Sequence, residues 1–179
     1  MEIAVSRSKI SGQVEIPGSK SHTIRAIVLA SLAKGTSTIK APLVSEDTVS
    51  CLQAASTLGA WIKRGDDTIW RISGTGGKLL QPAGVIDMGN SGTGLRLFTS
   101  IAARADFPIS FDGDESLRTR TMASLLAALQ AMGAKVESAN GKCPLSVTGP
   151  INGAEVTIEG KTSQYLSSLL FAAPLLEND

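Results

Sequence analysis

The positions of apolar residues along the chain predict a series of helices and short strands. A helical spacing, with apolar residues three and four positions apart, covers 24–29, 52–60, 95–98, 122–132 and 165–170. The helices over 52–60 and 126–134 both reach a glycine near their ends, and short strands are predicted after them at 60–63 and 135–137. Polar turns at 65–67 and 140–142 lead into further strands at 68–72 and 145–148. The pattern predicts a mixed α/β (α+β) fold.

The helix starts are repeated. Gly18, Gly89 and Gly160 recur at intervals of 71 residues, and each precedes small hydroxyl or amide residues and then an apolar run. Arg25 and Arg96 occupy equivalent positions in the first two copies. One unit is predicted to run strand, helix, strand, helix, strand, strand, with units at about 17–83 and 84–152 and an incomplete third unit at 153–179. Such units stack to bury a shared core, so we expect the chain to be part of a longer protein.

Composition narrows the functional classes. Hydrophobic residues make up 42% of the 179 residues but aromatic residues only 4%, which predicts an aliphatic core. With 17 basic and 16 acidic residues the net charge is +1, and this balance gives no support to a nucleic-acid or membrane partner. Cys51, Cys143 and the single His22 are too dispersed for a zinc cluster. Two isolated cysteines favour a reduced protein, and we expect a cytoplasmic one.

The helix starts could serve as an anion site. A helix N-terminus carries unpaired N–H groups and a partial positive charge, although a single Gly-x-Ser can equally be a simple helix cap. Three equivalent starts at one end of a lobe would combine their N–H groups. Lys20, in a first turn where a cation opposes the helix dipole, and Arg25, four residues after Ser21, fit such a site. Arg120 precedes a helix and is a further candidate, whereas Arg118 could equally be solvated or paired with an acid.

Four segments resemble a known family. The segments 17–26 (PGSKSHTIRA), 89–96 (GNSGTGLR), 113–120 (GDESLRTR) and 162–170 (TSQYLSSLL) are similar, in this order, to motifs of the 5-enolpyruvylshikimate-3-phosphate synthase family. The resemblance implies two lobes, each with three βαβαββ units around a pseudo-threefold axis. It identifies 17–179 as most of the N-terminal lobe and 1–16 as a strand segment associated with the other lobe.

The resemblance also implies a reaction. The enolpyruvyl group of phosphoenolpyruvate is transferred to the 5-hydroxyl of shikimate 3-phosphate, with release of phosphate and without a metal or other cofactor. The implied partners are therefore these two substrates and a missing C-terminal lobe of the same protein. The acid–base carboxylates are expected beyond Asp179, so the resemblance assigns no catalytic residue within 1–179.

The resemblance assigns substrate contacts residue by residue. It implies that Lys20 contacts both substrates, that Ser21 and Arg25 hold the shikimate carboxylate, and that Gln164 lies between the substrates. It places Gly92 and Arg120 at phosphoenolpyruvate, and Thr162 and Ser163 at the shikimate phosphate. Two residues depart from the family pattern: Thr162 replaces a serine, and Thr121 stands where proline is common.

Two other functions are compatible with this sequence. One is a non-catalytic substrate-binding lobe or fragment built on the same scaffold. The other is a related enolpyruvyl transferase acting on UDP-N-acetylglucosamine. That family carries a reactive cysteine in the loop corresponding to 118–120, where this sequence has none.

Overall fold

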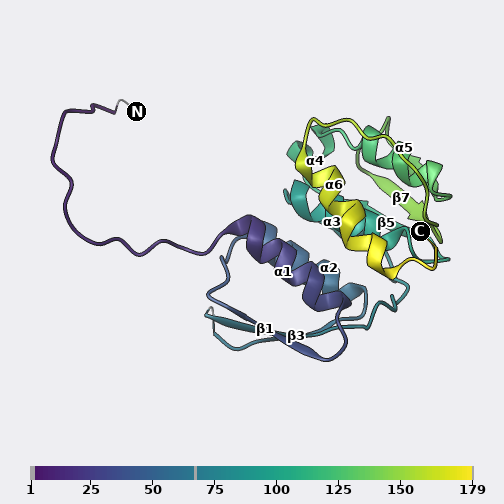
Figure 1. Ribbon diagram of the computed structural model, residues 1–179, viewed down its shortest axis with the longest axis horizontal. Coiled ribbons are helices and arrows are strands. Elements are labelled where there is room, and N and C mark those ends of the chain that lie inside the picture. The colour runs from purple at the N-terminus through teal and green to yellow at the C-terminus, as the bar shows by residue number, and fades with distance from the viewer. Residues whose placement is uncertain (1–2, 67, 179) are drawn as a thin grey trace.

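The computed structural model describes residues 3–66 and 68–178 as two neighbouring layered units with helices packed between them (Figure 1). Three sequence predictions extend to residues outside these ranges. They are the start of the strand segment 1–16, the last residue of the turn 65–67 and the end of the third unit at 179.

The first unit packs two helices on a three-stranded antiparallel sheet. Its elements are α1 (Lys20–Leu32), β1 (Thr36–Lys40), α2 (Glu46–Thr57), β2 (Trp61–Arg64) and β3 (Ile69–Ser73), with strand order β1-β3-β2. Ser45 and Thr48 form a reciprocal capping box at the start of α2. Gly59, with φ +110°, turns the chain from α2 into β2. The helices predicted around 24–29 and 52–60 and the strands predicted at 60–63 and 68–72 are thus confirmed.

The second unit repeats this plan and adds to it. It contains β4 (Ile86–Asp87), α3 (Gly92–Ala102), β5 (Ile109–Asp112), α4 (Glu115–Thr119), α5 (Ala123–Ala131), β6 (Lys135–Ser138) and β7 (Leu145–Thr148). The strand order is β4-β5-β7-β6, with β4 parallel to β5 and the other pairs antiparallel. The short helix α4 lies in a segment that the sequence pattern indicates only as polar. Asp114 caps it by accepting a hydrogen bond from the Leu117 N–H at 2.7 Å.

The expected first strand forms only in the second unit. In that unit β4 pairs with β5, but the described residues before α1 and those at 153–159 form no strand. A strand exists only with a hydrogen-bonded partner. Residues 3–16 instead extend away from the sheets (Figure 1), with Ile10 97% exposed. The third unit contributes α6 (Ser163–Ala172) and a short 3₁₀ turn (Ala173–Leu175).

The core lies between the two sheets, around the helices. α3 is the central helix: it packs against α1, α2 and α6, and nearly all its residues are buried. The core is mainly aliphatic, as predicted, although the largest fully buried side chains are those of Trp70, Phe98 and Phe111. Within 3–66 and 68–178, no helix has the length and apolar character needed to cross a membrane.

Candidate functional site

The N-termini of α1, α3 and α6 lie at the same end of the molecule, as the repeat predicts (Figure 1). In the first turns of α6 and α3, Gln164 Nε2 donates to Thr93 Oγ1 at 3.0 Å. One turn further on, Arg25 of α1 donates from Nη2 to Ser167 Oγ of α6 at 3.5 Å. The three partial positive charges at these helix starts therefore face one region.

Each of these helices is capped by a hydroxyl group. Ser19 Oγ accepts from the His22 N–H at 3.4 Å, Ser91 Oγ from the Gly94 N–H at 3.3 Å, and Thr162 Oγ1 from the Gln164 N–H at 3.2 Å. Among these three capping residues, Thr162 is also a predicted substrate-binding residue. Of the two hydroxyl residues predicted at the third helix start, Thr162 supplies the cap, and the next residue, Ser163, is exposed to solvent.

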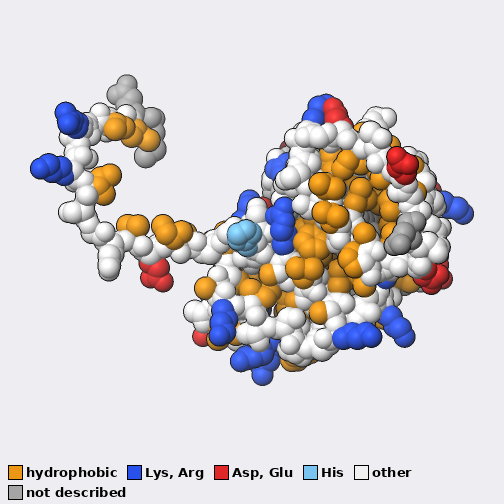
Figure 2. Space-filling model, viewed as in Figure 1, with side chains coloured by type: hydrophobic (Ala, Val, Ile, Leu, Met, Phe, Trp, Pro, Cys, Tyr) orange, Lys and Arg blue, Asp and Glu red, His pale blue; other side chains and the backbone are white. Residues whose placement is uncertain are grey.

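Lys20 has a partner within the protein. Its Nζ lies 2.6 Å from Asp47 Oδ2, at the start of α2, and half of the Lys20 side chain is exposed. A lysine in the first turn opposes its own helix dipole, and the Asp47 carboxylate offsets this repulsion. Ser21 is exposed beside it, and its carbonyl accepts from Arg25 Nη1 at 3.2 Å. Figure 2 shows basic side chains gathered around the single histidine, His22, at this end of the molecule.

The guanidinium of Arg120 lies over the start of α3. Arg120 Nη2 donates to Asn90 Oδ1 and, at 3.4 Å, to Ser116 Oγ. Asn90 in turn donates from Nδ2 to Asp114 Oδ2 at 2.8 Å. A Cβ placed on the buried Gly92 would lie only 2.7 Å from Arg120 Nη1. The structure therefore brings Gly92 and Arg120 together, and it adds Asn90, which the motif comparison quoted but did not single out.

Arg118 takes a structural role. It makes a two-pronged ion pair with Asp112, with Nε–Oδ1 at 2.9 Å and Nη2–Oδ2 at 2.6 Å. Hydrogen bonding from Arg118 is the main cause that lowers the pKa of Asp112 below its usual value. The alternative of an acid-paired Arg118 is thus the one that the structure confirms.

Gln164 contacts Arg96, which the sequence indicates only as the counterpart of Arg25 in the repeat. Its Oε1 accepts from Arg96 Nη1 at 2.7 Å. Arg96 belongs to α3 and Gln164 to α6, and the spacing within either helix cannot reveal a contact between them. The equivalence of Arg96 with Arg25 was the one signal available in the sequence.

A cysteine lies beneath this site but is not activated. The Cys51 Sγ is 3.4 Å from Ser91 Oγ. Burial raises the pKa of Cys51 to about 12. The thiol is therefore neutral near pH 7 and is not a nucleophile, because the thiolate is the reactive form.

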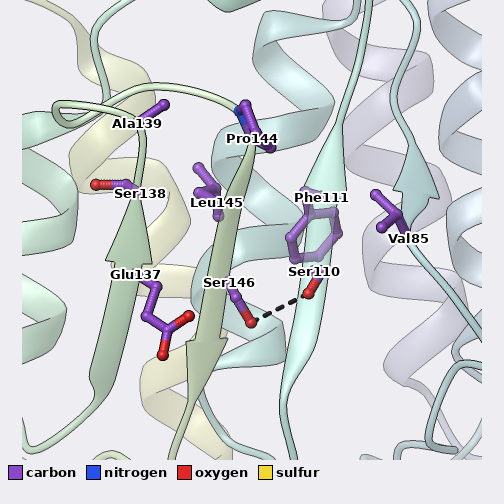
Figure 3. Close-up of a pocket in the computed structure, with 9 residues that line it drawn as sticks. All are labelled: Val85, Ser110, Phe111, Glu137, Ser138, Ala139, Pro144, Leu145 and Ser146. Atoms are coloured by element: carbon purple, nitrogen blue, oxygen red, sulfur yellow. Dashed lines mark hydrogen bonds between the residues drawn. The ribbon is translucent and has the colours of Figure 1, made fainter.

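A surface groove elsewhere in the molecule contains none of the predicted site residues. It lies over β5, β6 and β7 and is lined by Val85, Ser110, Phe111, Glu137, Ser138, Ala139, Pro144, Leu145 and Ser146 (Figure 3). Ser110 and Ser146 are joined across it by a hydrogen bond of 3.1 Å. Because this groove lacks basic side chains, the helix N-termini remain the candidate site for anions.

Comparison with known proteins identifies the family. The model of EPSP synthase (3-phosphoshikimate 1-carboxyvinyltransferase) matches residues 5–179. The whole chain is 49% identical to the 3-phosphoshikimate 1-carboxyvinyltransferase of Methanocorpusculum labreanum and 45% identical to that of Acetivibrio thermocellus, covering 43% of each relative. The solved EPSP synthase of Acinetobacter baumannii superimposes with a TM-score of 0.86 at 32% identity, over 93% of this chain and 38% of that one.

These matches agree with the resemblance that the four motifs carry. The chain spans less than half the length of the relatives it matches, and the matched part includes every motif. The solved family member has the same fold over nearly all of this chain. The chain belongs to the EPSP synthase family.

Proposed function

We propose that this chain is the N-terminal lobe of a 3-phosphoshikimate 1-carboxyvinyltransferase. The reaction transfers the enolpyruvyl group of phosphoenolpyruvate to the 5-hydroxyl of shikimate 3-phosphate and releases phosphate, a step of aromatic amino-acid biosynthesis. The observation that carries the proposal is the convergence of three helix N-termini with Arg25 and Arg120 at one end of a chain of this family. Both substrates are polyanions, and this end of the lobe offers the donors and positive charge that they require.

Each anionic group has a proposed partner. Ser21 and Arg25, at the start of α1, take the carboxylate of shikimate 3-phosphate, and Thr162 and Ser163, at the start of α6, take its phosphate. Gly92 and Arg120 take phosphoenolpyruvate at the start of α3. Because Gly92 has no side chain, a ligand can approach the N–H groups of this helix closely.

Lys20 and Gln164 complete the proposed site. Lys20 contacts both substrates and Gln164 lies between them. In the ion pair of Lys20 with Asp47, half of the Lys20 side chain and a fifth of the Asp47 side chain are exposed, and pairs at the protein surface contribute only about 0–1 kcal/mol. Lys20 can therefore exchange Asp47 for a substrate anion at little cost. These fixed charges stabilise the charge that develops in the transition state without moving during the reaction.

The rest of the enzyme supplies the remaining functions. In this proposal residues 1–16 pair as a strand with the other lobe, residues 17–179 form the lobe described above, and the acid–base carboxylates come from the second lobe. Closure of the two lobes excludes water from the substrates. The free, buried Cys51 and Cys143 fit a reducing compartment, and we place the reaction in the cytoplasm.

Turnover tests this function. The full-length gene product should release phosphate from phosphoenolpyruvate only when shikimate 3-phosphate is present. Lys20→Met or Arg120→Ala should lower kcat/KM by about 30- to 1,000-fold, which corresponds to about 2–4 kcal/mol for one lost charge-assisted contact. Arg71→Lys, on the exposed face of β3, is the matched control. The proposal fails if the wild-type protein shows no turnover, or if both site variants stay within twofold of it.

A further inference from the structure

Arg96 connects three of the segments that form the site. From the second turn of α3, its Nη1 donates to Gly92 O at 3.2 Å and to Gln164 Oε1 at 2.7 Å. Its Nη2 donates to Thr121 O at 3.4 Å, directly after Arg120. One guanidinium thus contacts the start of α3, the start of α6 and the loop that carries Arg120.

The position of this guanidinium is fixed from several sides. It lies over the ring of Tyr165, with 5.5 Å from Cζ to the ring centroid. Tyr165 is buried, and its hydroxyl donates to the same Thr121 carbonyl at 2.9 Å. The Arg96 Nε is buried without a hydrogen-bond partner among the described residues. Burying a donor unpaired is unfavourable, so the position of Arg96 is not the one that stability alone would select.

The contact with Arg96 determines which way the Gln164 carboxamide faces. A guanidinium has donors only, so it requires the oxygen end of the amide. The other end, Nε2, donates one hydrogen to Thr93 Oγ1 at 3.0 Å. A flipped amide would direct its NH₂ group at the guanidinium and lose the contact of 2.7 Å. The second N–H of Nε2 has no acceptor among the residues that the structure describes.

We propose that Arg96 is a positioning residue that fixes the Gln164 carboxamide with its oxygen toward α3, so that Gln164 presents an N–H donor to the anionic substrates. This inference rests on the proposed function, because it assigns a role to Arg96 within the same site. Arg25 holds the equivalent position in the first unit, but it donates to the Ser167 hydroxyl and has no amide to orient.

A double-mutant cycle in the full-length protein tests this role. Arg96→Met should lower kcat at least tenfold, with a smaller change in either KM. In a Gln164→Met background the same substitution should change kcat less than twofold, because its effect passes through Gln164. Arg96→Lys keeps the charge but loses the forked geometry, and it should recover part of kcat. An equal decrease in kcat from Arg96→Met in the wild-type and Gln164→Met backgrounds would overturn the proposal.

A second measurement does not depend on turnover. In full-length protein labelled with ¹⁵N-glutamine, the side-chain NH₂ signals of Gln164 are assigned by their loss in Gln164→Glu. Arg96→Lys should shift both signals, whereas Arg71→Lys on the exposed face of β3 should leave them in place. Unchanged signals in Arg96→Lys would refute the positioning role even in an active enzyme. Shifted signals in a protein without turnover would support the role and count against the proposed function alone.

Where Arg96→Met does not fold, the cycle is run with Arg96→Gln. This variant keeps a polar side chain, although a shorter one, and can donate only from an amide. Arg96→Gln should lower kcat in the wild-type background but change it less than twofold in the Gln164→Met background. An equal loss of kcat in both backgrounds would again overturn the proposal.

Discussion

At the scale of single residues, Gly92 leaves room for two guanidiniums at the candidate site. A methyl group there would lie 2.7 Å from Arg120 Nη1 and 3.1 Å from Arg96 Nη1. Both atoms belong to side chains and not to the backbone, so the helix can tolerate the change, but the Arg120 guanidinium has to move away. Gly92 therefore matters for the placement of charge more than for the backbone.

Gly92→Ala should separate binding from stability. We expect the KM for phosphoenolpyruvate to rise at least tenfold because Arg120 is displaced. The free energy of unfolding should stay the same or rise by up to about 1 kcal/mol, because alanine has the higher helix propensity. Steady-state kinetics and urea denaturation of the full-length protein measure the two effects. A KM within twofold of the wild-type value would show that Arg120 adjusts without consequence.

The site residues differ in how far the sequence reveals them. Lys20, Arg25 and Arg120 stand in recognisable motifs, and the repeat brings the helix starts that carry three of the four motifs to one end. Arg96 contacts Gln164, which is 68 residues away along the chain. Asn90 contacts Arg120, which is 30 residues away. Such contacts depend on how helices pack, and no spacing within one helix encodes them.

At the scale of elements, local periodicity predicts helices and the strands of hairpins well. The hairpin strands β2 and β3, and β6 and β7, form where the pattern places them, because each finds its partner a few residues away. The described residues before α1 and those at 153–159 form no strand, because a lone strand depends on a partner that its own residues do not specify. The helix α4 was missed because five residues are too few to show a helical period.

Arg104 links elements of all three units at the end of α3 opposite the site. It donates from Nη1 to Gly77 O at 3.1 Å, and from Nη2 to Leu175 O at 3.1 Å. Gly77 follows β3 near the end of the first unit, and Leu175 ends the short turn after α6. Partial burial lowers the pKa of Arg104, yet the side chain remains charged at neutral pH.

Arg104→Leu should therefore destabilise the fold without affecting substrate binding. Loss of hydrogen bonds from a charged, half-buried donor predicts a decrease of about 1.5–3 kcal/mol in the free energy of unfolding. Urea denaturation measures this decrease, and Arg104→Lys, which keeps one donor group, should lose less. A stability equal to wild type would mean that water replaces these contacts at no cost, and a raised KM would mean that the two ends of α3 are coupled.

At the scale of the whole molecule, the N-terminal segment is the part least integrated into the structure. Val5 and Ile10 are more than 90% exposed, and residues 3–16 extend away from both sheets (Figure 1). The proposed pairing of 1–16 with a second lobe explains why such apolar residues find no cover within this lobe. Leu166 and Leu170 of α6 are also exposed, and Figure 2 shows apolar side chains over this part of the surface.

Limited proteolysis tests that pairing. Trypsin should cut the 179-residue chain first after Arg7 and Lys9, well before any site in α1 to α6, because an extended and exposed backbone fits a protease. The same bonds in the full-length protein should resist cleavage under the same conditions. Mass spectrometry of the early fragments gives the result. Equal cleavage in both proteins would mean that the segment has no partner in the other lobe.

The 71-residue repeat described above also bears on ancestry. Positions that correspond across the three units carry Ser21, Gly92 and Ser163 at the helix starts, and Arg25, Arg96 and Ser167 one turn later. Duplication of one ancestral unit would have given three identical anion sites around an axis. The three present copies are not identical: Gly92 leaves the start of α3 open, whereas Ser21 and Ser163 place hydroxyl groups at the other two starts. An asymmetric pair of substrates could in this way be recognised by a scaffold that began as a symmetric one.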